Sequence, residues 1–293
     1  MVNSTKDLLR GSQPGKTNSA ALVGNPQFDF DEAQQRAALE KLEAGEKQAP
    51  LAAAMAVTSQ GVSRDFQGER LKQLPGTQEE VRQVKALLDE RGWQAEVFTG
   101  EGALEEAVKR VRSPRVLHLA THGFFENDQE KNLAEPRELG GGERPSGLED
   151  PMLRSGVYLA GANRALAHQP PVEGLESGVL TAYEATQLNL QGTELVVLSA
   201  CETGLGEQRE GEGVFGLRRA FQEAGAEAVL MSMWSVPDRE TQELMALFYG
   251  KWLAGMDKHE ALRRAQLEER ETVRKRYGKD LPYYWGAFVL VGR

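Results

Sequence analysis

An alternation of apolar, strand-like segments with amphipathic, helical segments constrains this chain more than any other feature. Residues 94–100 read QAEVFTG, 101–111 read EGALEEAVKRV and 116–123 read VLHLATHG, and the same alternation returns between 194 and 253. Strands that alternate with helices along a chain form a mostly parallel sheet with helices packed on both faces. The sequence therefore predicts an α/β fold.

The chain divides into a short polar start and one large domain. Residues 1–19 are rich in Ser, Gly, Asn and Lys, a composition typical of a flexible tail or linker. Residues 20–293 carry the strand and helix pattern and are numerous enough to bury one large core. A clear helix begins at Thr77, which we expect to cap it, with Glu80 three residues later completing a capping box.

Composition excludes several classes of partner. The formal charge of −9 would repel a phosphate backbone, so nucleic acid is not expected as a direct partner. No apolar run reaches the roughly 18–20 residues that span a bilayer, so no membrane partner is expected either. The single cysteine permits no internal disulfide, which suits a reducing cytoplasm.

Two of the predicted strands are followed directly by a side chain that can take part in catalysis. His122 follows the apolar run VLHLAT, and Cys201 follows ELVVLSA. In a parallel α/β sheet, catalytic groups gather beyond the carboxyl ends of the strands, where the loops converge. We therefore expect His122 and Cys201 to lie close together at that edge.

This pair has the chemistry of a cysteine peptidase. A thiol with an ordinary pKa of about 8.5 is mostly protonated at neutral pH, and a neighbouring imidazole raises its reactivity. Cys201 would attack the scissile carbonyl, His122 would protonate the leaving amine, and the backbone amides of Gly123 and Cys201 would hold the oxyanion. The residues alone leave another interpretation open, in which Cys201 fills a buried space and His122 is a hydrogen-bonded turn residue.

A metal site is a further alternative. His118 and His122 are four residues apart, but a strand separates such positions by roughly 13 Å, which is too far for one ion. No loop has the regular ligand spacing of an EF-hand. We therefore predict no metal and no cofactor.

The motifs, read together, resemble the CHAT domain, a branch of the caspase and separase group of cysteine peptidases found largely in bacteria. The resemblance runs from about 22 to 292 and includes HLATHG at 118–123, SGVYLAGAN at 155–163 and ELVVLSACETGLG at 194–206. It implies a caspase-like three-layer α/β sandwich. It also implies that the family's catalytic histidine and cysteine fall on His122 and Cys201.

The resemblance implies a biological setting as well. Several family members are fused or bound to tetratricopeptide or other sensor modules and cut a partner protein when a signal arrives. We therefore expect a cysteine endopeptidase with a protein or peptide substrate, a regulatory sensor protein or domain as partner, and a role in bacterial signalling or defence. Some related domains survive as inactive scaffolds, so the alternative is a catalytically silent protein-binding module.

Three further residues are candidates for substrate binding. Asp238 follows a predicted strand, and its carboxylate would favour Arg or Lys as the substrate residue before the cut. Residues 235–238 also resemble a capping box, in which the acid lies in the first turn of a helix and interacts with the helix dipole. Glu202 adjoins Cys201 and either orients a substrate or faces solvent. Trp234 either forms an apolar wall of the pocket or packs in the core.

One long irregular stretch, 126–152, interrupts the alternation of strands and helices soon after His122-Gly123. It is rich in glycine and proline, and long loops inside compact domains are commonly functional. It either covers the site, is cut to control activation, or is an inert insertion.

Overall fold

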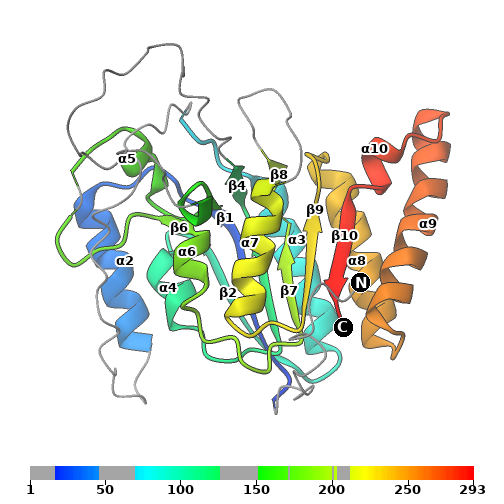
Figure 1. Cartoon of the computed structure of the whole chain (residues 1–293), viewed down its shortest axis with the longest axis horizontal. Helices are drawn as coiled ribbons and strands as arrows, with labels where there is room; N and C mark the ends of the chain where they lie inside the picture. The colour runs from blue at the N-terminus through cyan, green and yellow to red at the C-terminus, as the bar shows by residue number, and fades with distance from the viewer. Residues whose placement is uncertain (1–16, 46–69, 126–150, 171, 200, 203–211) are drawn as a thin grey trace, which may run out of the picture.

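The apolar runs of the predicted α/β domain form a central sheet that, within the described residues, has six strands (Figure 1). In spatial order these are β10 (Phe288–Gly292), β9 (Ala228–Ser232), β7 (Leu195–Leu198), β3 (Val116–Ala120), β1 (Ser19–Pro26) and β2 (Gln94–Gly100). Of these strands only β10 is antiparallel to its neighbour. Every residue of β3 and β7 is buried, which explains why both read as continuous apolar segments.

The computed structural model describes residues 17–45, 70–125, 151–170, 172–199, 201–202 and 212–293. Most of the predicted 1–19 tail and of the 126–152 loop lies outside these residues. None of the helices in the described ranges combines the length and the apolar character needed to cross a bilayer.

Helices cover both faces of the main sheet. On one face lie α3 (Pro75–Asp89), α8 (Asp238–Leu253) and α9 (Lys258–Tyr277), and on the other α4 (Glu105–Arg110), α6 (Ala182–Ala185) and α7 (Glu212–Glu223). Alternate strand residues enter the two cores: Leu22 and Val197 pack on the α3 side, whereas Val23 and Leu198 pack on the α7 side. The predicted fold class, a three-layer α/β sandwich with a mostly parallel sheet, is confirmed.

Four further helical elements lie in the described part of the chain. They are α2 (Glu32–Gly45), the 3-10 turn η1 (Pro151–Leu153), α5 (Ala162–Leu166) and α10 (Pro282–Trp285). The sequence of residues 180–190 favours a longer helix than the structure has, because only Ala182–Ala185 are helical there. Residues 179–181 belong instead to a strand.

A second, small sheet continues from the carboxyl edge of the main one. Its strands, in spatial order, are β6 (Val179–Thr181), β5 (Ser155–Tyr158), β4 (His122–Phe125) and β8 (Cys201–Glu202). The chain changes sheets at Thr121, whose buried hydroxyl donates a hydrogen bond to the Tyr158 carbonyl at 2.6 Å. His122 therefore lies just beyond a main-sheet strand and also begins a strand of a second sheet, which the sequence does not predict.

The start of α3 differs from the prediction. The helix begins at Pro75, and Leu74 occupies the N-cap position without a side-chain cap. Thr77 lies inside the first turn, where its hydroxyl donates to the Leu74 carbonyl and accepts from the Asn25 amide, both at 2.8 Å. Glu80 is 1% exposed. The predicted capping box at Thr77 is wrong, because Glu80 is directed into the core.

Candidate active site

Backbone pairing brings the two predicted reactive residues together. His122 is the first residue of β4 and Cys201 the first residue of β8, and they are register partners in a parallel ladder. Neighbouring strands lie about 4.8 Å apart, so the two backbones are adjacent. Gly123, the predicted oxyanion residue, pairs with Glu202 on one side and Val157 on the other. Of Cys201 and Glu202 the structure describes the backbone and not the side chains.

The imidazole of His122 is held by contacts on two sides. Its Nε2 lies 2.9 Å from the carbonyl oxygen of Lys72, and the Phe28 ring packs beside it with 5.3 Å between ring centroids. A carbonyl only accepts hydrogen bonds, so Nε2 carries a proton and the neutral ring has its lone pair on Nδ1. Nδ1 is buried and has no hydrogen-bond partner among the described residues. The ring therefore offers Nδ1 for proton transfer.

Burial lowers the pKa of His122 below that of a free imidazole, while the hydrogen bond to Lys72 and the negative charge of Asp238 act in the opposite direction. The resting ring is therefore uncharged at neutral pH. An uncharged imidazole can take the proton of a neighbouring thiol and pass it to a leaving amine.

A pocket of about 90 Å³ opens beside His122. The polar residues that line it besides His122 are Thr77, Glu80, Thr121, Ser199, Ser235, Asp238 and Thr241. The capping-box interpretation of residues 235–238 is wrong, because α8 has Pro237 at its N-cap and no side-chain cap. A Cβ atom at Gly76 would collide with the Asp238 side chain, so the glycine lets α3 approach the start of α8 closely.

Beneath the pocket lies a buried polar network that the sequence analysis missed. Glu80 accepts a hydrogen bond from Ser199 Oγ at 3.1 Å on one oxygen and from His118 Nε2 at 3.0 Å on the other. The second ring nitrogen of His118 lies 3.0 Å from the hydroxyl of Tyr249, whose pKa burial raises well above its usual value. Both ring nitrogens of His118 are thus occupied, which leaves neither to bind a metal with His122.

The remaining substrate-binding candidate lies beside the pocket. Trp234 is not among the described residues that line it, although Ser235 and Val236, which follow it, are. The indole N–H of Trp234 donates to the Tyr283 carbonyl at 2.9 Å, and its ring packs against the core on the α8 side. The observed contacts of Trp234 are therefore one hydrogen bond to the backbone and packing against the core.

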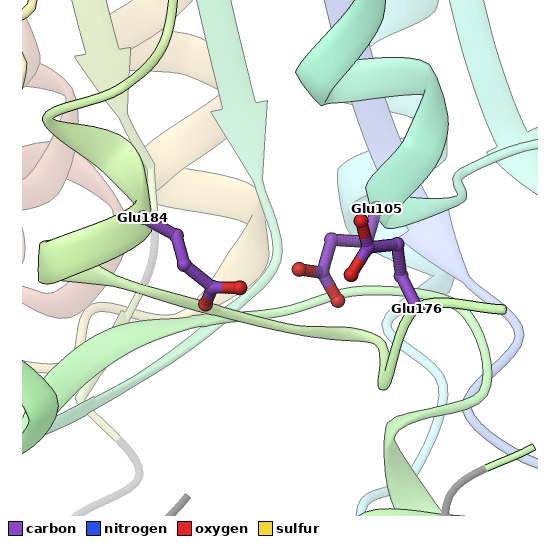
Figure 2. Close-up of side chains that lie close together, drawn as sticks. All are labelled: Glu105, Glu176 and Glu184. Carbon is purple, nitrogen blue, oxygen red and sulfur yellow. The ribbon is translucent and has the colours of Figure 1, made fainter. Parts of the chain in front are cut away.

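A separate group of carboxylates gathers between α4 and the 176–184 segment (Figure 2). Oxygens of Glu105, Glu176 and Glu184 lie within 4.8 Å of one another. The ammonium nitrogen of Lys109 lies 2.7, 3.0 and 2.9 Å from these three carboxylates respectively. Because this cation already sits among the three acids, we interpret the group as an ion-pair cluster that ties α4 to α6.

A family model described as "CHAT domain" matches residues 1–293. This chain belongs to the CHAT domain family. The family predicted from the motifs is thereby confirmed.

Curated relatives of this CHAT domain are much longer proteins. The human tetratricopeptide repeat protein 28 is 31% identical over 133 residues, which is 45% of this chain and 5% of that protein. Its mouse counterpart is 32% identical over 123 residues, which is 42% of this chain and 5% of that protein. The matched region thus spans about a twentieth of each relative.

Among solved structures, the Arg-specific cysteine proteinase gingipain R aligns with 95% of this chain and 46% of its own. The TM-score is 0.44 and the sequence identity 10%.

Proposed function

We propose that this CHAT domain is a cysteine endopeptidase in which Cys201 is the nucleophile and His122 the proton-transfer group. The observation that carries the proposal is the backbone pairing of Cys201 with His122, a residue that lines the pocket. The free Nδ1 of His122 supports a role in moving the thiol proton to the leaving amine. Gly123 and Cys201 supply the backbone amides that hold the oxyanion in this mechanism.

We further propose that Asp238 selects a basic residue before the cut. Its carboxylate lines the pocket together with His122, and the charge of Asp238 acts on the His122 ring. A guanidinium or ammonium group is the natural partner of a carboxylate at the end of such a pocket. In this proposal Glu202 and Trp234 contact the peptide on either side of the cut.

A catalytically silent protein-binding module is the second candidate. The pocket volume of about 90 Å³ is below the roughly 300 Å³ at which ligand pockets usually begin. The tetratricopeptide repeat proteins that match part of this chain also suit a role in protein interaction. A regulatory sensor protein as partner, and a cytoplasmic role in bacterial signalling or defence, belong to either candidate.

A comparison of three proteins separates the two candidates. The chain, Cys201→Ala and a control, His168→Ala, are incubated with a peptide library, and new termini are identified by mass spectrometry. We expect cleavage after Arg or Lys by the chain and by the control, and none by Cys201→Ala. Cleavage within residues 126–152 is scored in the same spectra. Equal cleavage by Cys201→Ala, or none by any of the three, would contradict the peptidase proposal.

A further inference from the structure

The Asn163 side chain forms two hydrogen bonds to the backbone of Leu71, in the neighbouring segment 70–74. Its Oδ1 accepts a hydrogen bond from the Leu71 amide at 2.8 Å, and its Nδ2 donates to the Leu71 carbonyl at 3.0 Å. Asn163 lies in the first turn of α5, is 8% exposed and ends the SGVYLAGAN motif. An amide side chain is suited to this contact because it offers both an acceptor and donors.

Segment 70–74 also contains the Lys72 carbonyl, which orients the His122 ring. Residue Lys72 follows Leu71, and its carbonyl accepts the proton on His122 Nε2. Residues 70–74 belong to no helix or strand, so no regular ladder of backbone hydrogen bonds fixes this carbonyl. The two bonds from Asn163 supply that constraint one residue away.

Asn163 also constrains Phe28, whose ring is the second contact of the His122 imidazole. Its backbone amide donates to the Phe28 carbonyl at 3.1 Å, and the Phe28 ring packs against His122. Its Nδ2 donates in addition to Asp29 Oδ1 at 2.8 Å. One residue therefore ties down both segments that touch the ring, and Figure 1 shows α5 at the same end of the molecule as β4 and β8.

We propose that Asn163 is a positioning residue for His122: by fixing the Lys72 carbonyl it keeps the proton on Nε2 and leaves Nδ1 as the nitrogen that exchanges protons. The inference deepens the proposed peptidase function, on which its catalytic meaning rests. Its structural content concerns only which ring nitrogen carries the proton, and that can be measured whether or not the chain cuts peptides.

The arrangement also predicts which substitutions break it. Alanine removes every bond from the side chain, and aspartate keeps the acceptor for the Leu71 amide but replaces the donors with an oxygen facing the Leu71 carbonyl and Asp29. Both changes free the Lys72 carbonyl to move away from His122. Without that acceptor the ring populates both neutral tautomers.

The test is nitrogen NMR of the imidazole rings above the pKa of His122. The chain has four histidines, so His122→Gln assigns the signals of interest. We expect wild type to show a protonated Nε2 and a bare Nδ1 at His122, and Asn163→Ala and Asn163→Asp to show shifts averaged between the two tautomers. Asn189→Ala, which changes an exposed asparagine bonded to Ser113, is the control and should match wild type.

Thermal unfolding accompanies each spectrum, and Asn163→Ser serves as the milder variant if the alanine variant does not fold. A folded Asn163 variant with an unchanged His122 tautomer would overturn the inference. If the chain proves to be a peptidase, kcat of Asn163→Asp should fall by about 10–100-fold with KM nearly unchanged. An inactive wild type with the expected tautomer shift would refute the peptidase function and leave the positioning role intact.

Discussion

The buried carboxylate of Glu80 offers the sharpest test of how this site is built. It bonds to His118 on β3 and to Ser199 directly after β7, which are the two strands that lead to His122 and Cys201. Glu80→Ala leaves the His118 N–H and the Ser199 hydroxyl without an acceptor in a region at most 3% exposed. Each unpaired buried group costs about 1–3 kcal/mol, so the two together cost about 2–6 kcal/mol.

We therefore expect Glu80→Ala to lower the free energy of unfolding by about 2–6 kcal/mol. At about 2–4 °C per kcal/mol this lowers Tm by at least ~4 °C. Glu80→Gln keeps one acceptor and adds donors, so its loss should be about half as large. Urea denaturation followed by circular dichroism measures both values.

A matched control lies one residue earlier on the same helix. Glu79 is exposed and bonds to Arg82, and exposed ion pairs contribute little to stability. Glu79→Ala should therefore leave the denaturation midpoint nearly unchanged. The reasoning fails if Glu80→Ala and Glu79→Ala lose the same free energy, because burial would then not determine the cost.

Three other predictions follow from the charges of the structure. The negative charge of Asp238 acts to raise the pKa of His122, so Asp238→Asn should lower that pKa further in an NMR titration. An unchanged pKa would show that the charge of Asp238 does not act on the His122 ring. Burial raises the pKa of Glu269 to about 7, so the contribution of this carboxyl to stability falls as pH rises from about 4.5 to 7. In urea denaturation Glu269→Gln should therefore be more stable than wild type at pH 8, by roughly 1–2 kcal/mol, and not at pH 4. Lys109→Met leaves the buried Glu105 without its cation and should cost about 3–5 kcal/mol in urea denaturation; a loss under ~1 kcal/mol would contradict the ion-pair interpretation.

The sequence predicts the main sheet well because its inner strands β1, β3, β7 and β9 are buried on both faces. Nearly continuous apolar segments such as those of β3 and β7 are typical of parallel strands that are covered on both faces. The change of sheet at Thr121 was not predictable in the same way. It depends on the bond to the Tyr158 carbonyl, and residues 37 positions apart in the chain leave no local pattern.

Two residues of the site environment were missed for different reasons. Glu80 carried a usable signal, because it shares the buried stripe of α3 with Val84 and Leu88, and an acid in an apolar stripe needs a buried partner. Asn163 carried little signal. Its role depends on Leu71 and Phe28, which approach it only after the chain has folded.

The small sheet has a consequence for regulation. His122 and Cys201 are neighbours in one ladder, whereas Asp238 belongs to α8 and Glu80 to α3, both packed on the main sheet. A partner that tilts the small sheet against the main one carries the histidine and the cysteine along as a unit. Such a tilt leaves the spacing of His122 and Cys201 unchanged and alters how the pair is aligned with Glu80 and Asp238, the acidic residues that line the pocket.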